Sequence, residues 1–118
     1  MTPLYEVIIN KNTKINPIWI MRQAGRYLPE FREIRSKNTD FIKLCLNPIL
    51  STEITLQPLK RFDFDAAIIF SDILMLPYGL NQNVEFKKDF GPILGKLDLD
   101  IISRVKEIDF IGRVQQVY

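Results

Sequence analysis

The 118-residue sequence contains no histidine and only one cysteine, Cys45. A single cysteine cannot form a disulfide within the chain. Cys45 lies in an apolar stretch, so we expect a buried thiol that packs as a small hydrophobic group. Without histidine, a zinc or copper site built only from protein side chains is not expected. The sequence therefore predicts neither a disulfide framework nor a metal centre.

The sequence also lacks a long apolar run and a strong excess of charge of one sign. No uncharged apolar stretch approaches the ~20 residues that span a bilayer, and no basic segment precedes an apolar run at the N-terminus. Lysine and arginine number 16 and aspartate and glutamate 14, which gives a net charge of +2. This balance gives no reason to expect nucleic acid or an anionic membrane as a partner. We expect a cytoplasmic protein.

The apolar residues that are present follow a strand–helix–strand order. Hydrophobic residues make up 47% of the chain, which is ordinary for a globular domain. Two short runs rich in β-branched and aromatic residues, 17–21 and 66–70, predict strands that are buried on both faces. Helical patterns separate them, which is typical of a parallel α/β pair. We expect helices at the following ranges: 3–9, 28–37, 41–46, 47–62 and 109–118.

Local signals sharpen some of these boundaries. Thr2 before Pro3 and Asn47 before Pro48 each predict an N-cap followed by the first helical residue. Pro58 is expected to kink or end its helix, because proline cannot donate to the carbonyl four residues back. Farther along, 84–86 alternates like a short exposed strand, and 89–92 is typical of a turn.

A sheet of two parallel strands cannot bury both of its own faces, because such strands need neighbours on each side. The pattern therefore predicts a piece of a larger α/β protein, such as an eight-stranded (β/α)8 barrel of ~250 residues. We expect residues 1–118 to be the N-terminal portion of a single barrel domain that is truncated at its C-terminus.

Charged residues follow both predicted strands. Arg22 and Arg26 come after the first, with Gly25 between them as a flexible point of the backbone, and Asp72 comes after the second. Ligands of parallel α/β folds bind at the carboxyl ends of the strands, so these groups would share one mouth. Two guanidiniums suit a substrate with carboxylates or phosphates. The alternative, a structural ion-pair network among the three, fits the pattern equally well.

Two blocks of sequence carry a resemblance to a known family. They read WIMRQAGRYLPEFR at 19–32, and LQPLKRF at 56–62 followed by AAIIFSDIL at 66–74. In this order and spacing they resemble the N-terminal signatures of the uroporphyrinogen decarboxylase family. An isolated pair of arginines would carry no weight, whereas contiguous blocks of this length are specific.

The resemblance implies a (β/α)8 barrel that acts as a homodimer in heme biosynthesis. Its reaction would remove the four acetate carboxyls of uroporphyrinogen III to give coproporphyrinogen III, with no cofactor. Asp72 would be catalytic, placed beside the pyrrole N–H groups. The residues implied to bind substrate are Arg22, Gln23, Ala24, Gly25, Arg26, Arg35 and Asp72.

Two alternatives remain open. Related barrels transfer methyl groups to or from a corrinoid, although the 21–26 block favours the decarboxylase. The chain could also be a non-functional product of a truncated gene, and no residue separates that reading from an enzyme fragment. In either case we expect the chain alone to be inactive.

Overall fold

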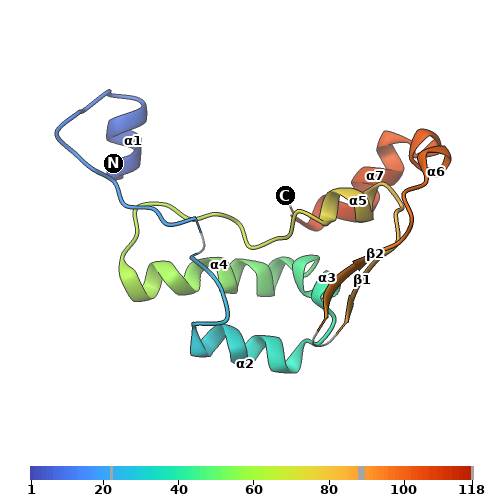
Figure 1. Ribbon diagram of the computed structural model, residues 1–118. Helices are drawn as coiled ribbons and strands as arrows, with labels where there is room; N and C mark the ends of the chain where they lie inside the picture. Colours follow the sequence, from blue (N-terminus) through green and yellow to red (C-terminus); the bar gives the residue numbers. More distant parts are fainter. Residues whose placement is uncertain (22, 88–89, 118) are drawn as a thin grey trace. The chain divides into compact units, whose positions relative to one another are not determined.

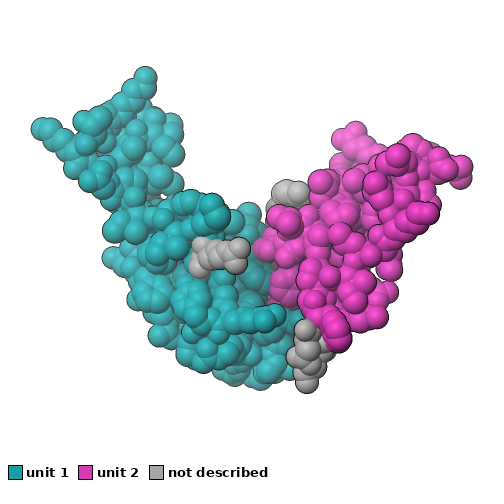
Figure 2. Space-filling model, in the orientation of Figure 1, with its two compact units in different colours: residues 1–37, 52–70 teal, residues 38–51, 71–118 magenta. Residues whose placement is uncertain are grey.

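The computed structural model describes residues 1–21, 23–87 and 90–117. It contains helices and one two-stranded antiparallel sheet (Figure 1). The chain divides into two compact units: unit 1 comprises 1–37 and 52–70, and unit 2 comprises 38–51 and 71–118 (Figure 2). No barrel is seen in the described ranges, and no helix there is both long and apolar enough to cross a bilayer.

Unit 1 is built on helices that the sequence predicts. They are α1 (Pro3–Ile8), α2 (Pro29–Lys37) and the greater part of α4 (Pro48–Phe62). The Thr2 hydroxyl oxygen accepts from the Tyr5 amide at 3.3 Å, which confirms the predicted cap of α1. The core contains Phe31 of α2, whose ring meets the edge of Phe70 with centroids 5.6 Å apart.

Helix α4 confirms one local prediction and corrects another. Asn47 Oδ1 accepts from the amides of Ile49 and Leu50, both at 3.1 Å, as its N-cap role requires. Pro58 does not end the helix, which runs on to Phe62. Proline removes one hydrogen bond, but Pro58 is fully buried and the Asp63 amide still donates to Leu59 at 3.0 Å. Packing thus offsets the missing donor.

The two predicted strands are not formed. Residues 17–20 and 66–69 run as drawn-out coil without regular secondary structure (Figure 1), Met21 lies in a turn and Phe70 at a bend, and a backbone hydrogen bond in this part of the chain runs from the Asp65 amide to Ile18 O at 3.0 Å. The Ile18 amide donates to the Asp65 carboxylate at 2.7 Å. A strand needs a neighbour that pairs with its backbone along its length, and the described residues supply none. The expected parallel pair, buried on both faces, is therefore wrong for this structure.

Unit 2 contains the sheet. Strands β1 (Val84–Lys87) and β2 (Gly91–Leu94) pair antiparallel, with Val84 opposite Leu94 and Lys87 opposite Gly91. The strand predicted at 84–86 is confirmed. Part of the turn predicted at 89–92 belongs instead to β2, while Asp89 lies outside the described residues. Gly91 has φ of 80°, a conformation that glycine adopts without strain.

Short helices complete unit 2, and two of them were not predicted. Helix α3 (Phe41–Cys45) carries the buried Cys45, as expected, and α7 (Glu107–Val114) leads into the 3₁₀ turn η1 (Gln115–Val117). Helices α5 (Met75–Gly79) and α6 (Leu99–Arg104) lie where the sequence indicated loops. Neither helix exceeds six residues, and so short a segment shows no clear helical period in its sequence.

Helices α5 and α7 pack closely because residue 79 is glycine. A Cβ at Gly79 would lie 2.5 Å from a ring carbon of Phe110 and 3.1 Å from a methyl of Val114. No real carbon pair tolerates the shorter of these distances. Gly112 of α7 is the contrasting case, since a Cβ there would meet nothing within 4 Å.

We predict that Gly79→Ala lowers the free energy of unfolding of unit 2 by about 1–3 kcal/mol, because α5 and Phe110 must move apart. Gly112→Ala is the matched control and should be neutral or stabilising by about 0.5–1 kcal/mol, the helix preference for alanine. Urea unfolding of the dilute chain, followed by circular dichroism, measures both variants. Equal midpoints for the two would contradict the packing argument.

Candidate functional site

Gln23 anchors the predicted substrate loop within unit 1. Its side chain is 5% exposed, and Nε2 donates to the Ala66 carbonyl at 2.8 Å. The Tyr27 hydroxyl donates to the carbonyl of Gln23. The start of the loop is therefore tied to the segment that precedes Phe70. A substrate contact for Gln23 stays a prediction, but its part in holding the loop is visible in the fold.

The next residues turn the chain into α2. The Leu28 amide donates to Gly25 O at 3.0 Å, while Ala24 and Gly25 are both partly buried. Gly25 does not adopt a left-handed φ, and a Cβ there would make an ordinary contact of 3.7 Å with the Tyr27 ring. The flexibility expected of Gly25 is therefore not used in this conformation.

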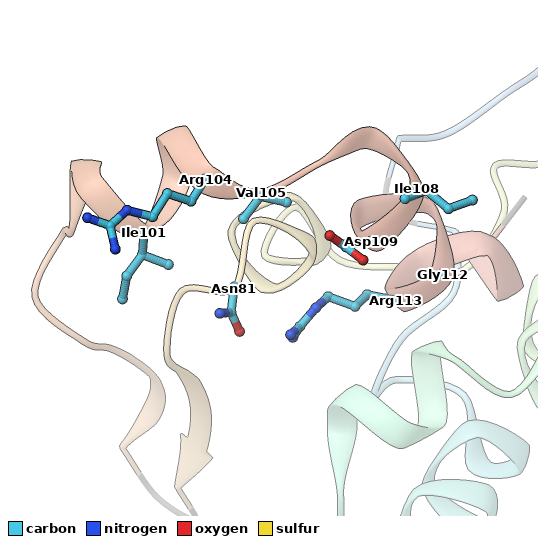
Figure 3. A pocket seen from close by; sticks show the side chains of 8 residues that line it. All are labelled: Asn81, Ile101, Arg104, Val105, Ile108, Asp109, Gly112 and Arg113. Atoms are coloured by element: carbon cyan, nitrogen blue, oxygen red, sulfur yellow. The ribbon is translucent and has the colours of Figure 1, made fainter.

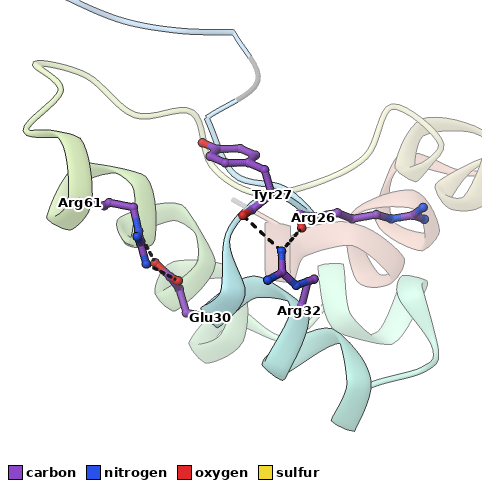
Figure 4. A network of polar contacts seen from close by, with 5 residues as sticks. All are labelled: Arg26, Tyr27, Glu30, Arg32 and Arg61. Carbon is purple, nitrogen blue, oxygen red and sulfur yellow. Dashed lines mark hydrogen bonds and ion pairs between the residues drawn. The ribbon is translucent and has the colours of Figure 1, made fainter.

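Arg26 has a fixed backbone and an uncommitted side chain. Arg32 Nη1 donates to Arg26 O at 2.8 Å and to Tyr27 O at 3.3 Å (Figure 4). The guanidinium of Arg26 is exposed and makes no hydrogen bond or ion pair with any residue that the structure describes. An exposed guanidinium of this kind can bind a carboxylate through two parallel N–H···O bonds.

Sequence reasoning assigned Arg32 no role in holding the loop. Its neighbour Glu30 is also committed: Arg61 Nε and Nη2 donate to its two carboxylate oxygens at 3.1 and 2.9 Å (Figure 4). The hydrogen bond from Arg61 lowers the pKa of Glu30, and the same bond raises the pKa of Arg61. This surface pair joins the start of α2 to α4, a contact of a kind that contributes little to stability.

Two other residues were predicted to contact the substrate, Arg35 and Arg22. Arg35 lies partly buried in the last turn of α2. Arg22 lies outside the described residues, so its role stays a prediction.

Asp72 is held in a turn at the start of α5 in unit 2. Its Oδ1 accepts from the Leu74 amide at 2.8 Å, and its backbone carbonyl accepts from Met75 at 3.0 Å. The carboxylate lines a pocket of about 190 Å³. Most of its other lining residues are apolar, and they include Met75 and Leu76 of α5 and Phe110 and Val114 of α7.

This pocket can receive only part of a large ligand. Pockets that enclose drug-sized molecules measure ~300–1,000 Å³, and a tetrapyrrole is larger than most drugs. Asp72 belongs to unit 2 and Arg26 to unit 1, and each unit is described by itself. The shared mouth expected for these residues accordingly stays a prediction.

A larger hollow on unit 2 contains none of the predicted site residues. It measures about 460 Å³ and lies beside α6, α7 and the loop at Asn81 (Figure 3). Arg104, Asp109 and Arg113 contribute its charged groups. In the described part of the chain, no three cysteine, aspartate or glutamate side chains gather as metal ligands would.

Comparisons with known proteins place these residues in a family. The family model described as Uroporphyrinogen decarboxylase (URO-D) matches residues 1–118. A uroporphyrinogen decarboxylase of Sinorhizobium fredii is 46% identical over 113 residues, 96% of this chain and 33% of that protein. The uroporphyrinogen decarboxylase of Agrobacterium fabrum is 46% identical over 95% of this chain and 33% of its own length. That of Brucella anthropi is 49% identical over 86% of this chain and 30% of its own length.

The chain thus spans about a third of the length of the curated relatives it matches. Because the family model covers every residue from 1 to 118, this chain belongs to the uroporphyrinogen decarboxylase family.

Proposed function

We propose that this chain supplies the N-terminal, substrate-binding part of an enzyme that decarboxylates the four acetate arms of uroporphyrinogen III to give coproporphyrinogen III. The observation that carries the proposal is the state of Arg26: a backbone held by Arg32 and a guanidinium without a partner in the described ranges. The family match supports the reaction. The whole enzyme would act in heme biosynthesis as a cytoplasmic homodimer and without a cofactor.

Arginine suits the first task, which is to hold a substrate that carries many carboxylates. Its planar fork donates two parallel hydrogen bonds to one carboxylate and keeps its charge at any physiological pH. Arg26 would bind one arm of the substrate, and Arg22 and Arg35 would add further carboxylate contacts. Ala24 and Gly25, which are partly buried in the same loop, would line the pocket beside them.

Asp72 suits the second task, which is to stabilise positive charge on the reacting ring. Protonation of the ring carbon adjacent to the one that bears the acetate arm makes the ring cationic. The bond from the arm's CH2 group to the carboxylate then breaks, its electron pair forms an exocyclic C=C bond that neutralises the ring, and carbon dioxide leaves. A proton added to this methylene carbon gives the methyl group, and loss of the first proton from the ring restores the pyrrole. A carboxylate already placed beside the pyrrole N–H groups stabilises that cation without rearranging. The Leu74 amide would keep Asp72 in this orientation, since it binds Oδ1.

We predict that Asp72→Asn, in a full-length decarboxylase that carries this segment, lowers kcat by about 10²–10³ while the protein still folds. The amide has the shape of the carboxylate but cannot stabilise a cation. Coproporphyrinogen formation measures the rate. Asp63→Asn is the matched control, because Asp63 is exposed with φ of 54°, which asparagine tolerates. Near-normal turnover by Asp72→Asn would sink the assigned role.

Arg26→Lys should raise KM for uroporphyrinogen about 10–100-fold in the same protein, because lysine keeps the charge but loses the bidentate bonds, worth ~1.5–3 kcal/mol. Arg104→Lys on α6, a residue outside the predicted substrate-binding set, serves as the control and should leave KM unchanged. Steady-state kinetics measure both. An unchanged KM for Arg26→Lys would show that this guanidinium does not hold the substrate.

Expressed alone, the 118-residue chain should form no coproporphyrinogen and should elute in size-exclusion chromatography as aggregated material. The extended segments leave apolar side chains and unpaired backbone in water, and such edges promote association. Asp72 would also face water, where its field is weak. A monodisperse chain that turns over uroporphyrinogen would refute this expectation.

A further inference from the structure

Arg32 donates to three consecutive backbone carbonyls at the end of the predicted substrate loop. Its Nη1 donates to Arg26 O at 2.8 Å and to Tyr27 O at 3.3 Å (Figure 4). Its own backbone amide donates to Leu28 O at 3.1 Å. The Leu28 amide in turn donates to Gly25 O at 3.0 Å. Every carbonyl from residue 25 to residue 28 therefore accepts a hydrogen bond, and three of the four accept it from Arg32.

Helix α2 by itself could not supply the two side-chain bonds. Leu28 precedes the helix, and its carbonyl accepts the first intrahelical bond, whereas the carbonyls before it have no helical donor. Side chains of a helix tilt toward its N-terminus. The long side chain of Arg32 can therefore reach back past the start of α2, and the two carbonyls ahead of Leu28 depend on this one guanidinium.

Two observations connect this contact with the substrate as well as with the fold. Arg32 is exposed and makes no ion pair with a described carboxylate, so its Nη1 is committed to neutral carbonyls. One of the residues that it holds, Arg26, has an exposed guanidinium that no described residue engages. An arginine whose backbone is already fixed loses less conformational freedom when it binds a carboxylate, so it binds more tightly.

We propose that Arg32 is a positioning residue: it fixes the backbone of residues 26 and 27 so that the Arg26 guanidinium is presented to a carboxylate arm of the substrate. Arg32 itself does not touch the substrate and takes no part in bond breaking. The inference rests on the proposed function, because it needs Arg26 to hold the substrate. It goes further by assigning part of the substrate affinity to a residue outside the predicted substrate-binding set.

The test uses a full-length decarboxylase that carries this segment. Arg32→Met keeps a long side chain that favours a helix but removes both donors. It should raise KM for uroporphyrinogen about 10-fold and change kcat less than about twofold, because two net hydrogen bonds are lost from binding alone. Lys37→Met is the matched control, since it removes an exposed positive charge and its pair with Glu33 from the same helix, and it should leave KM unchanged.

A double-mutant cycle separates positioning from direct contact with the substrate. If Arg32 acts through Arg26, Arg32→Met should change KM by no more than about twofold in a protein that already carries Arg26→Lys. Effects that multiply would show that Arg32 acts on the substrate independently of Arg26. An unchanged KM for Arg32→Met alone would show that Arg32 has no part in binding. Either result overturns the proposal.

Hydrogen exchange reports on the loop without reference to turnover. The Leu28 amide, which is bonded to Gly25 O, should exchange at least about fivefold faster in Arg32→Met. In Lys37→Met its exchange should be unchanged. If Arg32→Met leaves this rate unaltered, Arg32 does not fix the backbone and the proposal is overturned, whatever KM does.

The inference and the proposed function can be told apart by these variants. If Arg26→Lys raises KM and Arg32→Met does not, the function stands and the positioning role fails. If Arg26→Lys leaves KM unchanged, the proposed substrate contact of Arg26 fails, and the positioning role fails with it even where the Leu28 amide exchanges faster.

Discussion

An extended backbone must pair along its length, and this requirement governs most of unit 1. The segments 17–21 and 66–70 have the composition of central strands, yet no backbone hydrogen bond joins them in the described part of the chain, and the nearest one runs from the Asp65 amide to Ile18 O. The backbone of helices α2 and α4 is hydrogen-bonded mainly within each helix, so these elements need no neighbouring strand, and burial of side chains such as Phe31 and Ile54 stabilises them. Backbone hydrogen bonding is therefore largely satisfied in the helices and unsatisfied along these two segments.

The candidate site follows the same division. The loop that carries Arg26 is held at three places. Gln23 holds its start, Arg32 holds its middle, and the Glu30–Arg61 pair joins its end to α4. Every one of these supports lies within unit 1. For the polycarboxylate substrate proposed above, this loop would supply one part of the binding surface.

On unit 2, Asp72 is likewise held by contacts within its own unit. One carboxylate oxygen accepts a hydrogen bond from the Leu74 amide in the turn before α5, and Asp72 lines a pocket together with Phe110 and Val114. A residue that shapes the backbone and also faces a hollow has little freedom to reorient. For a group proposed to meet a developing cation, such fixed placement is an advantage, because no reorganisation is needed when the charge appears.

Local chemistry was enough to predict several elements from the sequence. Thr2 and Asn47 predicted helix starts, because their side chains make hydrogen bonds within three residues. The alternation at 84–86 predicted β1. The blocks around Arg26 and Asp72 identified the family, because long contiguous motifs preserve information that composition does not. Each of these signals acts over a few residues.

Only the tertiary structure decided what depends on distant partners. It carried α4 through Pro58, because burial against the core compensated for one lost bond. It paired Arg61 with Glu30 and gave Arg32 two backbone carbonyls, contacts that no helical spacing reveals. It also left the predicted strands unpaired. Strand formation is a property of neighbours, and a sequence pattern can specify the need for a neighbour without supplying one.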